Sequence, residues 1–350
     1  MSKHLLVVAG GTGGHIFPGI AVAETLKHAG WTVSWIGTAD RMEAEVVPKH
    51  HIEIDFIEVK GVRGNGLKRL LSAPWMVTKA IKDAIAVIKK RQPDVILAMG
   101  GYVTGPVGIA ARLLGIPLVI HEQNAVAGFS NRCLSRIASK VLAAFPGAFN
   151  GAEIVGNPVR ASVVKLSPKE AVGALKVLVV GGSLGAQVFN DVLPEAFQTL
   201  SELGEIQIRH QTGRNNLPKV QSLYDAIGLS AQVDEFISDM DAAYDWADIV
   251  ICRAGALTVS EIAAAGKLAL FVPYPYAVDD HQTANAQFLV DGGAAHLIAQ
   301  KDFNKESIVA LLRPYFSARD AIYEKACIAK QLAVTDASQK VAAICEALTS

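Results

Sequence analysis

The strongest constraint on the fold is a segment that occurs twice: a short apolar run, a glycine-rich loop and a helical pattern. The first copy reads VVAGGTGGHIFPGIAVAETL (residues 7–26) and the second reads VLVVGGSLGAQVFNDVLPEAF (residues 177–197). Gly11 and Gly182 correspond and stand 171 residues apart. A buried strand that turns through glycines into a helix is a typical opening of a doubly wound α/β domain. The repeat therefore predicts two such domains.

The rest of the chain continues the same alternation of short apolar runs and longer amphipathic stretches. We expect strands at residues 5–9, 32–36, 54–59, 95–98, 118–120, 140–143, 176–180, 205–211, 233–236, 249–252, 269–272 and 295–297. Strands separated by helices favour parallel sheets covered by helices. Twelve strands with one interruption indicate two open sheets, and a single closed (β/α)8 barrel is the alternative.

The domain boundary is expected near the sequence Gly-Asn-Pro-Val-Arg at residues 156–160, because a polar stretch follows it. The length of 350 residues is about twice that of a typical domain, which agrees with two domains. We therefore place the first domain at residues 1–160 and the second at 161–335. A last helix, at about 336–350, is expected to cross back and pack on the first domain.

The two halves differ in charge although the formal net charge is zero. Residues 1–160 hold 18 lysines and arginines against 11 aspartates and glutamates, and the remainder holds 15 against 22. A first domain with a charge of +7 favours an anionic partner: a phosphate, a nucleic acid or an acidic lipid surface. Four dispersed cysteines outside CxxC pairs indicate a reduced cytosolic setting. No unbroken apolar stretch of about 18 residues appears, so any membrane contact is expected to be peripheral.

The glycine loops place backbone N–H groups at the positive end of a helix, where a phosphate or a developing anion can bind. The alternative is a tight turn without a ligand. Neither loop continues into the Gly-Lys-Ser/Thr of a P-loop. The dinucleotide fingerprint needs a glycine where Ile16 stands, and the second strand lacks the acidic residue that would hold a ribose. A nicotinamide or flavin enzyme is therefore not favoured.

Three further features carry possible chemistry. His15 follows the first loop directly and could act as a general base on a hydroxyl, or could simply cap or pack the helix. Glu261 follows another buried strand and glycine turn, and could accept hydrogen bonds from a ribose diol; the alternative is a solvated helix glutamate. A polar cluster at residues 279–285 suits sugar hydroxyls. The acidic triplet at residues 239–241 resembles a metal-binding DxD motif, but we interpret it as a helix start.

Together these motifs resemble the MurG family, the bacterial N-acetylglucosaminyltransferases of peptidoglycan synthesis. The resemblance runs almost end to end. It rests on GGTGGH (10–15), GGYVTGP (100–106), HEQNAVAG (121–128), GNPVR (156–160), GGSLGA (181–186), ALTVSEIAAAG (256–266) and DDHQTANA (279–286). Each motif is weak alone, whereas the ordered set is highly specific.

The resemblance implies the GT-B fold, two Rossmann-like doubly wound parallel-sheet domains facing a cleft. It implies a hexosyltransferase that moves N-acetylglucosamine from UDP-GlcNAc to the 4-hydroxyl of the muramyl sugar of lipid I, giving lipid II with inversion. No cofactor, obligatory metal or nucleic acid is expected. The first domain would meet the acceptor at the cytoplasmic face of the inner membrane, peripherally, and other cell-wall synthesis proteins are possible partners.

The resemblance also implies roles for individual residues. His15 would be the base or an acceptor-positioning residue. The other residues carried over are Thr12, Gly13 and Gly14 in the first loop, Asn124 near the sugar, Arg160, Ser183 and Ile237 on the donor, Ala256, Leu257, Thr258, Val259, Ser260 and Glu261 around diphosphate and ribose, and Gln282 at the sugar hydroxyls.

Some points stay open. Leu184, Leu268 and Tyr276 depart from the residues usual in the family, and the departures affect one side-chain contact near the diphosphate. A basic and apolar stretch at residues 67–82 could contact a membrane or could be an ordinary amphipathic helix. A UDP-GlcNAc 2-epimerase of the same fold and a non-catalytic nucleotide-binding module are the functional alternatives.

Overall fold

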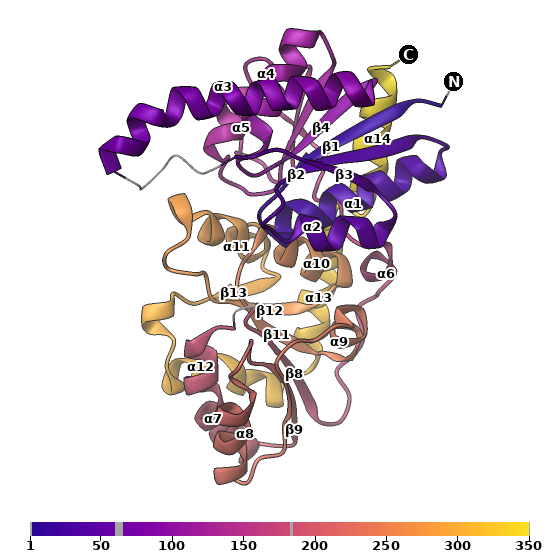
Figure 1. Cartoon of the computed structure of the whole chain (residues 1–350). Helices are drawn as coiled ribbons and strands as arrows, with labels where there is room; N and C mark the ends of the chain where they lie inside the picture. The colour runs from indigo at the N-terminus through magenta and orange to yellow at the C-terminus, as the bar shows by residue number, and fades with distance from the viewer. Residues whose placement is uncertain (1, 60–65, 183–184, 350) are drawn as a thin grey trace. The chain divides into compact units, whose positions relative to one another are not determined.

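Figure 1 shows the computed structural model of the chain, which describes residues 2–59, 66–182 and 185–349, with side chains omitted for residues 66–73. The chain divides into two compact units. Unit 1 comprises Met1–Arg160 together with Val334–Ser350, and unit 2 comprises Ala161–Ala333. Each unit has its own sheet, and every neighbouring pair of strands in the described residues runs parallel.

Unit 1 is built on a sheet whose described strands follow the order β3-β2-β1-β4-β5-β6-β7. The strands are β1 (His4–Ala9), β2 (Thr32–Gly37), β3 (Glu53–Phe56), β4 (Val95–Gly100), β5 (Leu118–Glu122), β6 (Lys140–Ala143) and β7 (Glu153–Ile154). The helices are α1 (Gly13–His28), α2 (Glu43–Val46), α3 (Gly66–Arg91), α4 (Thr104–Leu114), α5 (Phe129–Leu134) and α14 (Ala337–Ala347), with a 3-10 turn η1 (Val47–His50).

Strand β1 shows why this sheet is covered on both faces. Leu5 and Val7 belong to one buried cluster and Leu6 and Val8 to another, and all four are fully buried. Successive side chains of a strand point to opposite faces, so a continuous apolar run fits a sheet with helices on both sides. Figure 1 shows α1 and α14 over one face and α3, α4 and α5 over the other.

Helix α14 completes one face of unit 1 although it comes last in the chain. Val341, Ala342 and Cys345 are buried in the same cluster as Ile20 and Leu26 of α1. The apolar face of α14 therefore belongs to the core that forms around β1.

Unit 2 repeats the arrangement with the strand order β10-β9-β8-β11-β12-β13. The strands are β8 (Leu175–Val180), β9 (Ile206–Gln211), β10 (Gln232–Asp234), β11 (Ile249–Cys252), β12 (Leu268–Phe271) and β13 (Ala295–Leu297). The helices are α6 (Ala161–Val164), α7 (Gln187–Ser201), α8 (Leu217–Ala226), α9 (Met240–Trp246), α10 (Ala256–Ala265), α11 (His281–Asp291), α12 (Lys305–Leu312) and α13 (Asp320–Leu332), with 3-10 turns η2 (Val278–Asp280), η3 (Gln300–Asp302) and η4 (Arg313–Phe316).

The predicted fold class, two doubly wound parallel sheets, is confirmed. The barrel alternative is wrong, because each sheet is open and has two edge strands, β3 and β7 in one and β10 and β13 in the other. All twelve predicted strands are present within a few residues of their predicted limits. Strand β7 was not predicted, since it has two exposed residues and no apolar run.

Candidate active site

The strand orders locate a ligand-binding position in each unit. In unit 1 the chain passes from β1 outward to β3 and then returns to β4 on the other side of β1; in unit 2 it passes from β8 outward to β10 and returns to β11. Open α/β sheets bind ligands at such switch points, outside the carboxyl ends of the strands. The motif GGTGGH follows β1 and GGYVTGP follows β4, whereas GGSLGA follows β8 and the turn before α10 follows β11. The motifs thus gather at the two switch points.

The first glycine loop turns sharply from β1 into α1. Gly11 has a φ of +98°, a backbone conformation that favours glycine, and Thr12 is the extended N-cap residue of α1. Gly13 and Gly14 are the first two helical residues, so their N–H groups lie in the first turn, where a helix binds anions. These three predicted residues therefore share one helix start.

His15 lies one residue further into the same turn and is half-buried. Its ring nitrogen Nδ1 lies 3.3 Å from the carbonyl oxygen of Gly10. A carbonyl oxygen can only accept a hydrogen bond, so Nδ1 carries a proton, and in the neutral ring the lone pair is then on Nε2. The ring also packs on Gly100 at the end of β4, where a Cβ atom would lie 2.7 Å from the His15 Cδ2 atom. The geometry gives the tautomer that a general base needs.

Glu43 also contacts the first glycine loop, although no sequence motif includes it. Its side chain is fully buried. The carboxylate accepts hydrogen bonds from the Gly11 N–H (3.0 Å), the Thr38 N–H (2.9 Å) and the Thr38 hydroxyl (2.7 Å). A buried carboxylate therefore holds the first glycine loop, and it accepts the hydrogen bond of the Gly11 N–H.

The segment after β5 is shaped by a second buried carboxylate, that of Glu122. It accepts hydrogen bonds from the Asn124 N–H (3.0 Å), the Asn124 side chain (3.1 Å), the Gly128 N–H (3.0 Å) and the Asn131 side chain (2.9 Å). The half-buried Asn124 is thus fixed at the carboxyl end of β5. Glu122 is therefore the residue that fixes Asn124, and the sugar contact expected for Asn124 stays a prediction.

In unit 2 the second glycine loop packs against the end of β9. The Gln211 side chain donates to the Gly182 carbonyl oxygen (3.3 Å). Gly185 has a φ of +75°, and a Cβ atom there would lie 2.1 Å from the Thr212 carbonyl oxygen, so only glycine fits. Ser183, predicted to contact the donor, and the departure at Leu184 lie outside the described residues.

In unit 2, helix α10 starts at the turn that follows β11. Gly255 is its extended N-cap residue, so the N–H groups of Ala256, Leu257 and Thr258 lie in the first turn. The Ser260 hydroxyl donates to the Ala256 carbonyl oxygen (3.0 Å). Val259 is fully buried and its N–H donates to the Gly255 carbonyl oxygen (2.9 Å), so it supports the turn from inside.

Glu261 lies further along α10 and is only 7% exposed. The hydroxyl of Tyr244 donates to its Oε2 atom (3.3 Å). The alternative reading of Glu261 as a solvated helix glutamate is therefore wrong. A buried carboxylate one turn from a helix start suits a hydroxyl-rich ligand beside an anionic one.

Gln282 and Arg253 tie the α10 turn to the segment after β12. The Gln282 side-chain oxygen accepts the Ala254 N–H (3.3 Å) and the Tyr274 N–H (2.9 Å). Arg253 donates to the Val272 carbonyl oxygen (3.0 Å), and burial lowers the pKa of its guanidinium. Gln282 and Arg253 thus both hydrogen-bond the segment that follows β12.

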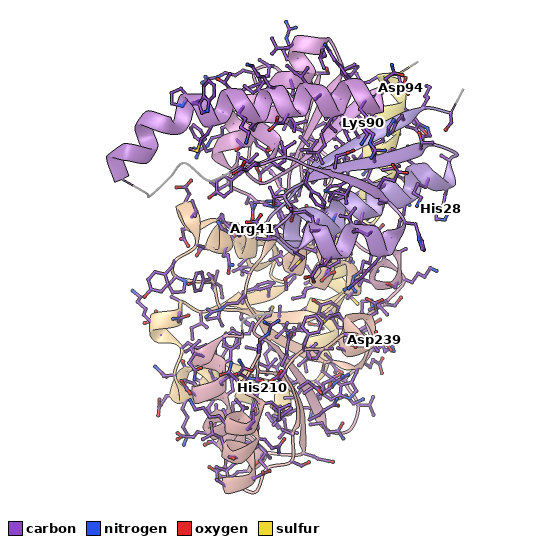
Figure 2. All side chains as sticks on the ribbon, in the orientation of Figure 1. His28, Arg41, Lys90, Asp94, His210 and Asp239 are labelled. Carbon is purple, nitrogen blue, oxygen red and sulfur yellow. The ribbon has the colours of Figure 1, made fainter. Side chains whose placement is uncertain are left out.

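The remaining predicted residues lie near the ends of strands or units. Ile237 is 4% exposed and follows β10, and Arg160 is the last residue of the first segment of unit 1. Asp239, labelled in Figure 2, is the N-cap residue of α9 and accepts the Ala242 N–H (3.0 Å), as the helix-start interpretation predicts. Within the described residues, no group of three or more His, Cys, Asp or Glu side chains could hold a metal ion.

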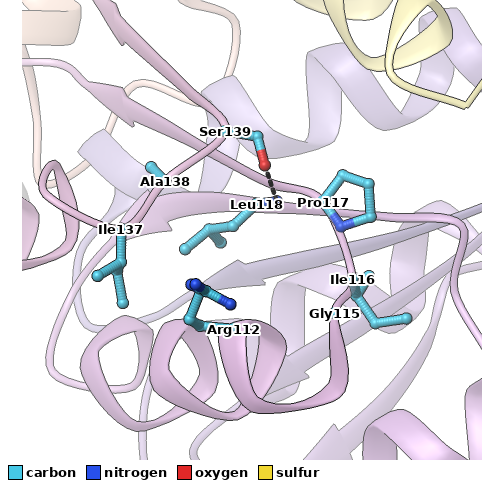
Figure 3. Close-up of a pocket in the computed structure, with 8 residues that line it drawn as sticks. All are labelled: Arg112, Gly115, Ile116, Pro117, Leu118, Ile137, Ala138 and Ser139. Carbon is cyan, nitrogen blue, oxygen red and sulfur yellow. Dashed lines mark hydrogen bonds between the residues drawn. The ribbon is translucent and has the colours of Figure 1, made fainter.

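A surface pocket of about 340 Å³ lies elsewhere in unit 1, at the amino ends of β5 and β6. Figure 3 shows Arg112 directed toward Leu118 and Ile137, and the Ser139 hydroxyl accepting the Leu118 N–H (3.2 Å). The predicted ligand-binding residues of unit 1 lie at the carboxyl ends of the strands, so this pocket contains none of them. The departure at Leu268 is fully buried at the start of β12, and the one at Tyr276 is 80% exposed.

Both units match known glycosyltransferase domains. Residues 5–143 match the glycosyltransferase family 28 N-terminal domain and residues 176–341 match its C-terminal domain. The fold and the two matches define the class of protein, a GT-B glycosyltransferase with two Rossmann-like domains.

Comparisons over the full length of the chain identify the family within this class. The UDP-N-acetylglucosamine–N-acetylmuramyl-(pentapeptide) pyrophosphoryl-undecaprenol N-acetylglucosamine transferase of Pseudoalteromonas translucida is 61% identical, over 100% of this chain and 99% of that protein. The crystal structure of Acinetobacter baumannii MurG is 44% identical with a TM-score of 0.87, over 99% of each chain. The chain therefore belongs to the MurG family.

A solved UDP-N-acetylglucosamine 2-epimerase is also similar, with a TM-score of 0.67 over 97% of this chain and 95% of that one. Its sequence identity is 13%, so this likeness concerns the fold alone. Across the described residues, none of the helices has the length and apolar character needed to span a membrane.

Proposed function

We propose that this chain transfers N-acetylglucosamine from UDP-GlcNAc to the 4-hydroxyl of the muramyl sugar of lipid I. The products are lipid II and UDP, with inversion at the anomeric carbon. The observation that carries the proposal is the 61% identity, over the whole chain, to a transferase whose name states this donor group and this acceptor. The 2-epimerase alternative shares only the fold.

His15 is proposed as the base of this reaction. The bond between the acceptor O4 and the sugar C1 forms while the bond between C1 and the UDP oxygen breaks. The hydroxyl proton passes to His15 Nε2, and the electron pair of the broken bond leaves with UDP. The hydrogen bond from Nδ1–H to the Gly10 carbonyl oxygen supports this role, because in the neutral ring the lone pair is then on Nε2.

The donor is assigned to unit 2. The first-turn N–H groups of α10 are suited to the charge that develops on the departing diphosphate. Glu261 accepts hydrogen bonds from the ribose, Ile237 contacts uracil through its backbone, and Gln282 reaches the sugar hydroxyls. Arg160 and Ser183 are further donor contacts in this proposal. No step needs a bound metal ion.

The acceptor is assigned to unit 1. Thr12, Gly13 and Gly14 lie at the start of α1 beside His15, and Asn124 lies at the end of β5 in the same sheet. The charge of +7 over residues 1–160 suits the diphosphate of lipid I.

Unit 1 is also assigned to the cytoplasmic face of the inner membrane, as a peripheral contact. Trp75 of α3, Leu113 of α4 and Phe129 of α5 are 75%, 67% and 64% exposed. Exposed apolar side chains on a basic unit suit an anionic lipid surface; the predicted contacts at residues 67–71 lie outside the described side chains. Weaker binding of Trp75→Ser to vesicles rich in anionic phospholipid is expected, and unchanged binding would contradict the assignment.

One incubation separates the functional alternatives. The chain is mixed with UDP-GlcNAc and a short-chain lipid I analogue, and the products are separated. A disaccharide-linked lipid together with UDP is the expected result. Free UDP-ManNAc without disaccharide would indicate a 2-epimerase, and no turnover with intact UDP-GlcNAc binding would indicate a binding module.

A further inference from the structure

Glu43 is a buried carboxylate that the proposed reaction does not yet use. It lies in α2, and its side chain is fully buried. An ionised carboxylate without partners in such a place is strongly unfavourable, so its hydrogen bonds matter more than those of an exposed one. Its three donors come from two residues, Thr38 after β2 and Gly11 in the first glycine loop.

Two glycines make room for this carboxylate. A Cβ atom at Gly10 would lie 2.5 Å from the Glu43 Oε1 atom, and one at Gly37 would lie 2.6 Å from the Glu43 Cγ atom. Both distances are too short for any side chain. The lack of a side chain at position 10 is therefore explained by Glu43, which packs against the loop.

A single peptide group connects Glu43 to His15. The N–H of Gly11 and the carbonyl of Gly10 belong to the same peptide, which is trans and planar. Glu43 accepts the N–H of this peptide at 3.0 Å, and His15 Nδ1 lies 3.3 Å from its carbonyl oxygen. Because the two ends of a planar trans peptide point in opposite directions, fixing the N–H also fixes the direction of the carbonyl.

The other side of the His15 ring is fixed by β4. Gly100 has a φ of +114°, and its carbonyl oxygen accepts the Gly10 N–H at 3.4 Å. A Cβ atom at Gly100 would lie 2.9 Å from His15 Nε2. The imidazole therefore lies between the backbone of β4 and the peptide held by Glu43, and movement of that peptide would move the ring.

We propose that Glu43 is a positioning residue of the transfer reaction: through the Gly10–Gly11 peptide it sets the orientation and the tautomer of the His15 imidazole. This inference rests on the proposed role of His15 as the base. The peptide also transmits charge, since a carboxylate that accepts the N–H polarises the carbonyl and makes it a stronger acceptor for Nδ1–H.

Glu43→Gln tests the inference, because glutamine keeps the shape but replaces one oxygen by an N–H2 group. If the amide oxygen accepts the two hydrogen bonds from Thr38, the NH2 group faces the Gly11 N–H. Two donors cannot hydrogen-bond each other, so the contact that holds the loop is lost. We expect kcat to fall roughly tenfold, which corresponds to the loss of one charge-assisted hydrogen bond. The UDP-GlcNAc KM should stay within about twofold. An unchanged kcat would overturn the inference.

Thr38→Val is the matched control. It removes the hydroxyl donor to the same carboxylate but leaves the Gly11 contact in place, so kcat should stay within about twofold. If Thr38→Val lowers kcat as much as Glu43→Gln does, general loosening around the carboxylate explains both effects and the inference is wrong.

A double-mutant comparison with His15→Ala shows whether Glu43 acts through His15. If it does, Glu43→Gln should cause no more than about a twofold further loss of kcat once the imidazole is gone. A further tenfold loss would contradict the inference. If Glu43→Gln folds poorly, Gly10→Ala provides a second variant, because its methyl group would displace the carboxylate. It too should cause no more than about a twofold further loss of kcat in the His15→Ala background.

The same data separate this inference from the proposed function. If His15→Ala alone keeps the normal kcat, the base role of His15 fails and the inference fails with it. If His15→Ala loses activity and Glu43→Gln does not, the base role stands and only the positioning role of Glu43 is lost.

Discussion

At the scale of single residues, the buried glutamates of the two units differ in their hydrogen-bond donors. Glu43 and Glu122 each accept N–H groups from the loops beside them and so determine the shape of those loops. Glu261 accepts a side-chain hydroxyl, that of Tyr244, and lies next to a helix start in unit 2. We therefore interpret the first two as structural supports of the acceptor side and Glu261 as a group that meets the donor.

Glu261→Ala tests this distinction. Removing the carboxylate should raise the UDP-GlcNAc KM roughly tenfold or more, because a charge-assisted hydrogen bond to the ribose contributes about 1.5–3 kcal/mol. Steady-state kinetics with saturating acceptor gives the measurement.

Tyr244→Phe is the control for Glu261→Ala. Both changes break the bond between Tyr244 and Glu261, but only the alanine variant removes the proposed ribose partner. The donor KM of Tyr244→Phe should stay within about twofold of normal. A donor KM that is unchanged in Glu261→Ala would rule out the ribose role.

At the scale of elements, the ends of the strands are joined to distant segments by buried polar side chains. His121 at the end of β5 hydrogen-bonds the Gly156 carbonyl oxygen (2.9 Å), and the Asn157 side chain donates to the Gln123 carbonyl oxygen (3.1 Å). The segment before Arg160 is therefore attached to the segment that carries Asn124. Burial lowers the pKa of His121 to about 4.

This buried histidine predicts a loss of stability in mild acid. The unfolded imidazole binds a proton below about pH 6.5, whereas the folded one does so only below about pH 4. Between these values the unfolded state binds more protons, so stability falls as the pH falls. From pH 7 to pH 5 the free energy of unfolding of unit 1 should decrease by about 2 kcal/mol on this account.

Guanidinium unfolding at pH 7 and pH 5 measures the effect, and His121→Gln should remove about 2 kcal/mol of the difference between the two pH values. His28→Gln is the control, since this side chain is exposed at the end of α1 (Figure 2) and should leave the difference as it is. If the free energy of unfolding changes by the same amount between pH 7 and pH 5 in His121→Gln and in the normal protein, His121 is not the cause of the acid sensitivity. His210 in unit 2 is a separate contributor, because burial lowers its pKa to about 3.

At the scale of the whole molecule, the sequence was sufficient for whatever depends on local pattern. The apolar runs and glycine turns gave the strands, the two sheets and the helix starts at Gly13 and Ala256, because each is encoded by neighbouring residues. The roles of Glu43 and Glu122 could not be predicted in this way. Glu43 meets Gly11 across 32 residues, and nothing in its local sequence shows that its carboxylate is buried.

The division of labour between the units depended on the resemblance as well as on the pattern. The repeat alone indicates two equivalent phosphate-binding loops. The two loops differ in the structure. In the first loop the Gly11 N–H donates to Glu43, and His15 packs on Gly100, whereas the second loop packs against Thr212. The proposed assignment of the acceptor to unit 1 and of the donor to unit 2 uses this difference.

We propose that His15 in unit 1 serves the acceptor hydroxyl while unit 2 holds the donor. The most direct test is the steady-state transfer kinetics of His15→Ala with both substrates varied. We expect kcat to fall by about 10² or more while the UDP-GlcNAc KM stays within about twofold. A normal kcat with only a raised acceptor KM would show that His15 positions the acceptor, and a normal kcat with a raised donor KM would contradict the division between the units.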